Sequence, residues 1–98
     1  MKYQDMNDNR LSELVRLVVS TLDKTDPDRA KAAIQPLKNA GLTSGLHMRK
    51  GLNARETLEW YAGQIIDVID TESWFAVNSI IQCVDEFAPV LTSEREMK

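Results

Sequence analysis

The chain has 98 residues, of which 43% are hydrophobic and 28% are charged, and its net charge is −3. This length and composition fit one domain with a single small core. No run of about 18 apolar residues occurs, so we expect no membrane-spanning helix.

The modest net charge hides a strong segregation along the sequence. Residues 1–28 carry −2, residues 29–55 carry +6 and residues 56–98 carry −7. Blocks of like charge are typical of surfaces that bind an oppositely charged partner, and also of segments that pair with each other. Both interpretations stay open at this point.

Cysteine usage and the N-terminal residues favour a cytoplasmic protein. Cys83 is the only cysteine, so no disulfide can form within the chain. The first ten residues, MKYQDMNDNR, lack the apolar stretch of a signal peptide. We therefore expect a reducing, cytoplasmic location.

We expect the side chain of Asp8 or Asn9 to cap the first predicted helix, which runs to about Asp23. Its apolar stripe consists of leucines and valines at helical spacing, namely Leu11, Leu14, Val15, Val18 and Leu22. Residues 1–8 are expected to be frayed.

The second predicted helix is broken. Asp26-Pro27 is a start signal, because Asp26 can accept hydrogen bonds from free backbone amides and proline suits the first helical position. Pro36 removes a backbone donor inside the apolar pattern, so we expect a break near Gln35.

A glycine-rich segment, residues 41–53, separates this helix from the third. It shows no clear period, which predicts a functional or mobile loop, although a short hairpin or helical turn stays open. Asn53 and Glu56 form a capping-box pattern that begins a helix running to about Asp70. The apolar face of this helix comprises Leu58, Tyr61, Ala62, Ile65, Ile66, Val68 and Ile69.

The fourth predicted helix, Thr71–Leu91, is apolar over about half of its circumference. Such a helix needs neighbours on two sides, so we expect it to be the central element. Asp70 or Thr71 can cap it after a very short connection, which makes it an antiparallel neighbour of the third helix. With a polar tail at 92–98, the predicted fold is all-α: a single domain, 1–98, forming an irregular bundle of about four helices.

Trp60 is the main anomaly of the third helix. It lies about 200° from Leu58, on the polar side, where large aromatic residues are unusual unless something covers them. Because tryptophan is a frequent interface anchor, we predict a partner-binding face composed of Glu56, Glu59, Trp60, Gln64 and Asp67. The alternative is that residues 41–53 fold over Trp60 within the monomer. Phe75 is expected to be buried against the preceding helix.

The basic segment 29–55 supports a different hypothesis, binding to nucleic acid phosphates. The candidate contacts are Arg49, Lys50 and Arg55. No aromatic residue lies in this segment to stack on bases, and Pro36 interrupts the position of a recognition helix. The competing interpretation is that these basic residues pair with the acidic helices, within the chain or across a dimer interface.

Catalytic chemistry has little support. His47 is the only histidine, and no Ser/His/Asp spacing surrounds it. We expect no enzyme activity, no metal and no cofactor. The sequence instead predicts a protein-binding regulator of the adaptor, inhibitor or immunity type, bacterial or phage in origin, whose partner has a basic surface. A homodimer is a further expectation.

Overall fold

The computed structural model describes residues 1–22, 25–47 and 50–88. A short 3₁₀ turn and six α-helices follow one another in this part of the chain, which forms no strand. Their bounds are η1 (Tyr3–Asp5), α1 (Asp8–Thr21), α2 (Pro27–Ala33), α3 (Gln35–Asn39), α4 (Ala54–Asp70), α5 (Trp74–Gln82) and α6 (Val84–Phe87). The predicted small all-α bundle is confirmed, and two of its four helical segments are each divided in two.

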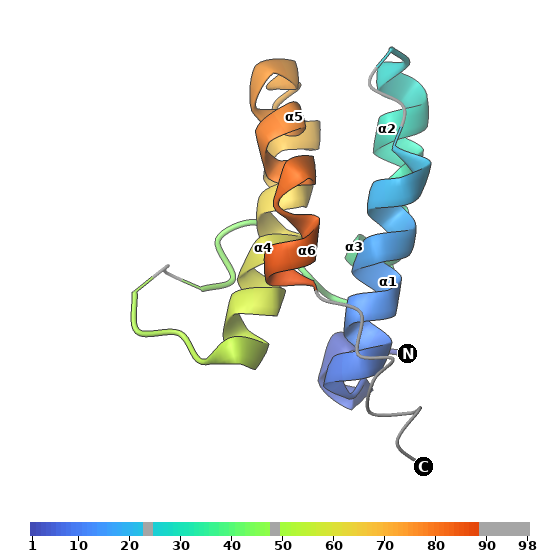
Figure 1. Cartoon of the computed structure of the whole chain (residues 1–98). Helices are drawn as coiled ribbons and strands as arrows, with labels where there is room; N and C mark the ends of the chain where they lie inside the picture. The colour runs from blue at the N-terminus through green and yellow to red at the C-terminus, as the bar shows by residue number, and fades with distance from the viewer. Residues whose placement is uncertain (23–24, 48–49, 89–98) are drawn as a thin grey trace.

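Helix α4 is the centre of the bundle. Figure 1 shows two antiparallel helical pairs side by side, α1 with α2 and α4 with α5. Helix α4 packs against each of the other five α-helices in the described part of the chain. Its buried residues are Leu58, Tyr61, Ala62, Gly63, Ile65, Ile66 and Ile69.

The start of α4 follows the capping-box prediction. The Asn53 side chain accepts a hydrogen bond from the Glu56 backbone N–H at 2.8 Å, and Glu56 accepts one from the Asn53 N–H at 3.2 Å. The helix ends at Asp70 as expected. A local signal of four residues therefore predicted both the position and the type of this element.

The second helical segment breaks where Pro36 predicts it. Helix α2 begins at Pro27 with Asp26 as its cap, ends at Ala33, and is followed directly by α3. Ile34 lies at the junction, and both Ile34 and Leu37 are fully buried. The bend therefore turns apolar side chains from both short helices toward the core.

Helix α1 begins one residue earlier and ends two residues earlier than predicted. Asn7, rather than Asp8 or Asn9, is the cap, and its side chain accepts from the Arg10 N–H at 2.7 Å. Asp8 consequently lies in the first turn and is available for an ion pair. The expectation of a frayed 1–8 segment does not apply to Tyr3–Asp5, because the Tyr3 N–H donates to the Ala40 carbonyl at 2.8 Å.

The prediction of a continuous, central helix over Thr71–Leu91 was wrong. Helix α5 begins only at Trp74, with Ser73 as its cap residue, and Cys83 separates α5 from α6. Val77 is the buried residue of α5. Leu91 lies outside the described residues.

The connection before α5 explains its peripheral place. Glu72 adopts a φ of 56°, and the Ser73 N–H donates to the Val68 carbonyl at 2.9 Å. This tight turn folds α5 back along α4, which confirms the predicted antiparallel neighbours (Figure 1). Because α5 packs on α4 along one side, the other apolar residues of α5 stay partly exposed.

Candidate functional site

All five residues of the predicted partner-binding face belong to α4, and four of them share one stripe of this helix. On a helix, Glu56, Asp67, Trp60 and Gln64 fall within an arc of about 80°. Glu59 lies about 60° outside this arc, on the side that faces the segment 41–53. The structure thus brings four predicted residues to one stripe and separates the fifth from them.

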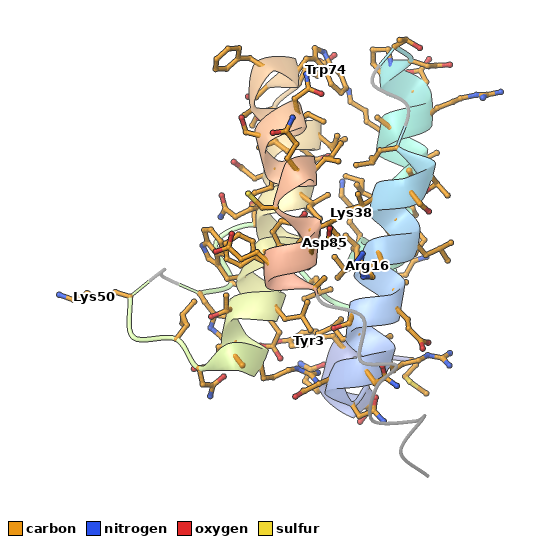
Figure 2. All side chains as sticks on the ribbon, in the orientation of Figure 1. Tyr3, Arg16, Lys38, Lys50, Trp74 and Asp85 are labelled. Atoms are coloured by element: carbon orange, nitrogen blue, oxygen red, sulfur yellow. The ribbon has the colours of Figure 1, made fainter. Side chains whose placement is uncertain are left out.

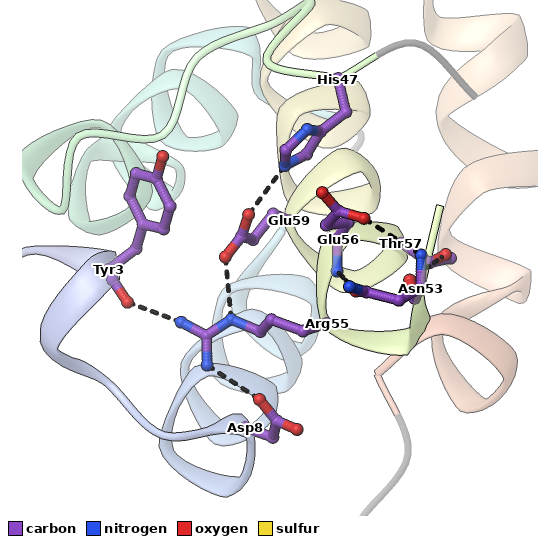
Figure 3. A network of polar contacts seen from close by, with 8 residues as sticks. All are labelled: Tyr3, Asp8, His47, Asn53, Arg55, Glu56, Thr57 and Glu59. Carbon is purple, nitrogen blue, oxygen red and sulfur yellow. Dashed lines mark hydrogen bonds and ion pairs between the residues drawn. The ribbon is translucent and has the colours of Figure 1, made fainter. Parts of the chain in front are cut away.

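Glu59 belongs to an internal polar network instead of an exposed acidic face (Figure 3). Its side chain is 12% exposed and accepts from His47 Nε2 and from Arg55 Nε, both at 2.8 Å. His47 belongs to the segment 41–53, so this carboxylate holds that segment against α4. Burial with two hydrogen-bonding partners is a structural role, and sequence periodicity alone could not show it.

Arg55 is the second hub of this network. It donates to Asp8 Oδ1 at 2.9 Å and to the Tyr3 carbonyl at 2.7 Å, in addition to Glu59. Burial disfavours its charge, but the hydrogen bonds and charges of Asp8 and Glu59 outweigh that effect and raise the pKa of Arg55. Figure 3 shows the guanidinium lying between these partners, where it joins the N-terminal turn, α1 and α4.

Other basic residues of 29–55 also pair with acids inside the chain. Lys38 Nζ lies 2.9 Å from Asp70, and Lys31 Nζ lies 3.8 Å from Glu72. Arg16 of α1 pairs with Asp85 of α6. The segregated charges therefore meet within one molecule, which confirms the interpretation of intramolecular pairing.

The structure describes two of the three alternative nucleic-acid contacts, Lys50 and Arg55, and their side chains lie in different surroundings. Arg55 is engaged in the network, and Lys50 is exposed and points away from the helices (Figure 2). Arg49 lies outside the described residues. In the described part of the chain, Lys31, Lys38 and Arg55 of the basic segment each lie beside a carboxylate.

A surface groove lies between α4 and the α5–α6 segment, beside the stripe that carries Trp60. We call it the α4–α5 groove, and its volume is about 370 Å³. It is lined by Trp60, Gln64 and Val68 of α4, by Ala76, Ser79, Ile80 and Cys83, and by Glu86 and Phe87 of α6. The wall is mostly apolar with a carboxylate at one end, which suits an apolar side chain from a binding partner.

Aromatic side chains form the wall of this groove beside α6. Trp60 is half-buried, and its ring meets Phe87 edge-on at 5.7 Å between ring centroids. Phe87 also stacks on Tyr61 at 5.1 Å, and the Tyr61 hydroxyl donates to the Ile80 carbonyl at 2.6 Å. Helix α6 therefore contributes to the cover of Trp60, which neither sequence-based alternative included.

Phe75 shows where the sequence reasoning failed most clearly. It was expected to be buried against the preceding helix, yet 94% of it is exposed. The reason is that α5 turns Val77 and Trp74 toward the core, which leaves Phe75 on the outer side. The sequence of α5, WFAVNSIIQ, contains no charged residue, and this feature could have indicated an exposed apolar surface.

The described residues hold no group of three or more His, Cys, Asp or Glu side chains arranged for a metal ion. Their helices also include none that is both long and apolar enough to cross a bilayer. Comparisons with protein-family models, curated proteins and solved structures find no match to this chain. The groove and its surroundings are therefore the basis of the functional argument.

Proposed function

We propose that this chain is a non-enzymatic regulator that binds another protein through the α4–α5 groove. The observation that carries the proposal is Trp60, half-buried in the wall of an open, mostly apolar groove. A rigid aromatic side chain offers a large contact area at a small entropic cost, which is why such residues are enriched among interface anchors. Gln64, beside it, supplies a hydrogen-bonding group.

The charge around the groove favours a partner with basic residues. Glu86 lines the groove, and Asp67 lies two turns along α4 from Trp60 on the same stripe. In contrast to Glu59, these carboxylates are not enclosed in the Arg55 network. An acidic rim around an apolar centre accelerates association with a basic surface and selects against acidic ones. Adaptor, inhibitor and immunity proteins work by such stoichiometric binding.

The internal ion pairs make nucleic acid the weaker candidate. Lys31, Lys38 and Arg55 each have a carboxylate partner within the chain. Releasing Arg55 to a phosphate would leave Glu59, at 12% exposure, without its guanidinium partner. Protein binding needs no such rearrangement, so we favour it.

Affinity capture from the native lysate, with variants that add positive charge, tests the proposal. Glu13→Lys is the control, because it makes on α1 the same change of charge that Asp67→Lys makes on α4. Wild type and Glu13→Lys should recover one protein in near-equal amount. Asp67→Lys and Gln64→Arg should recover it poorly, because they place positive charge on the stripe of α4 that carries Trp60. Equal recovery by all four proteins, or no stoichiometric protein with wild type, would overturn the proposal.

A further inference from the structure

On the basis of the proposed function, we infer that the part of the partner that enters the α4–α5 groove is a basic amphipathic α-helix. The two long walls of the groove are antiparallel helices (Figure 1). Trp60, Gln64 and Val68 follow one another at four-residue intervals on α4, so this wall is about 12 Å long. Two turns of a third helix span about 11 Å, so a helix can lie along the groove and contact both walls.

The opposite wall is suited to close packing of a helix. It consists of Ala76, Ser79 and Ile80 of α5 and of Cys83, which follows α5. These residues succeed one another at intervals of three and four, the spacing of one helix face. Three of the four side chains are small, so the backbone of a docked helix can approach this wall closely.

The groove offers a binding partner side chains rather than backbone groups. Most N–H and C=O groups along its walls are bonded within helices, and the described part of the chain forms no strand that another strand could join. An extended segment would therefore bury its own amides and carbonyls in the apolar groove with few partners, which costs free energy. An α-helix bonds its backbone internally and contacts the groove with side chains alone.

The rim of the groove along α4 and α6 is acidic, which requires basic residues on one side of the docked helix. Asp67 lies about 60° from Gln64 around α4, on the side away from the buried Tyr61. Glu86 lines the groove beside α6, and none of the described residues that line it is basic. Residues 56–88 contain no Lys, Arg or His. Lysine or arginine on the docked helix would therefore meet carboxylates without a competing cation from these elements.

The rim along α5 is apolar, which sets the other side of the docked helix. Phe75 is 94% exposed and lies about 40° from Ser79 around α5, on the side away from Ile80. The apolar surface therefore continues past the groove across α5, whose nine residues include no charged one. A helix with an apolar face toward α5 and basic residues toward Asp67 matches both rims.

Titration of the isotope-labelled chain with three synthetic peptides, followed by NMR, tests the inference. The first peptide, of about 18 residues, has leucines along one helical face and lysines and alanines elsewhere. The second carries proline at two central alanines, which prevents a helix but keeps every leucine and lysine. The third carries glutamate in place of lysine. The first should shift the amides of Gln64, Val68 and Ser79 and the Trp60 indole, and the other two should bind at least about 10-fold more weakly.

Two serine variants separate binding in the groove from general attraction to an acidic protein. Ser79 lines the groove and Ser20 is exposed on α1, so Ser79→Arg and Ser20→Arg add the same charge at two exposed serines. Ser79→Arg should weaken binding of the first peptide at least about 10-fold, and Ser20→Arg by less than about twofold. Equal weakening by both variants would overturn the inference.

The peptides also distinguish the other possible occupants of the groove. Equal binding of the proline peptide would assign it to an extended segment, and equal binding of the glutamate peptide would remove the basic requirement. Shifts of the same amides on dilution without peptide would assign it to a second copy of the chain. Each result, or no shift with the first peptide at about 1 mM, would overturn the inference. Because the peptides replace the native partner, a protein recovered by affinity capture would still support the proposed function in any of these cases.

Discussion

A Cβ atom added to Gly63 would lie 2.5 Å from the Thr43 carbonyl oxygen, because the loop backbone passes directly over α4 at this glycine. We expect Gly63→Ala to lower the free energy of unfolding by about 1–2 kcal/mol. Overpacking against backbone outweighs the gain of about 1 kcal/mol in helix propensity. Urea unfolding measures the difference, and a stabilised variant would mean that the loop does not rest on Gly63.

Tyr61 is fully buried and donates its hydroxyl hydrogen to the Ile80 carbonyl at 2.6 Å. Tyr61→Phe should therefore lower the free energy of unfolding by about 1 kcal/mol at neutral pH. The loss is moderate because Ile80 also accepts from the Cys83 N–H at 3.3 Å. Tyr3→Phe makes the same chemical change on a partly exposed ring and should change stability by less than about 0.5 kcal/mol. Equal losses would show that the Ile80 contact contributes nothing.

Burial raises the pKa of Tyr61 above its ordinary value of 10.0. The unfolded chain therefore loses this proton at a lower pH than the folded chain does. The stabilisation is complete below about pH 10 and is lost as the pH rises above that value, by up to about 1.4 kcal/mol per pH unit. The stability advantage of wild type over Tyr61→Phe should shrink between about pH 9 and pH 11. A constant advantage in unfolding curves across that range would contradict the prediction.

Glu59 and Glu56 lie one helical turn apart but should respond differently to the same substitution. Glu59→Gln should cost about 1.5–3 kcal/mol, because Glu59 accepts two charge-assisted hydrogen bonds at 12% exposure. Glu56→Gln should change stability by less than about 0.5 kcal/mol, since glutamine also completes a capping box. Chemical unfolding of both variants checks the difference. If Glu59→Gln leaves the free energy of unfolding unchanged, the polar network does not help to hold the loop to α4.

Local signals predicted the helices well. Asn53 and Glu56 are three residues apart, and their mutual hydrogen bonds depend only on that spacing. Pro36 breaks its helix through its own ring and its missing N–H, without help from any distant residue. Features determined by neighbouring residues were therefore readable before the fold was known.

Features determined by contacts between distant residues could not be predicted from the sequence. Glu59 and Trp60 are adjacent in sequence, yet one is enclosed by His47 and Arg55 while the other lines a groove with α6. The hydrophobic pattern of α5 shows that it is apolar, but only the packing of α4 against five helices shows which apolar helix becomes central. The groove likewise exists only because α6 brings Phe87 beside Trp60.

The Arg55 network has a consequence for the order in which the chain folds during synthesis. Arg55 reaches Asp8, 47 residues earlier, and the Tyr3 carbonyl, 52 residues earlier. The first helical pair is synthesised before Arg55, so the N-terminal turn can bond to Ala40 at that stage but not yet to the guanidinium. Translation that pauses before residue 55 would therefore present a nascent chain in which Asp8 lacks its guanidinium partner and α1 can pack only against α2 and α3.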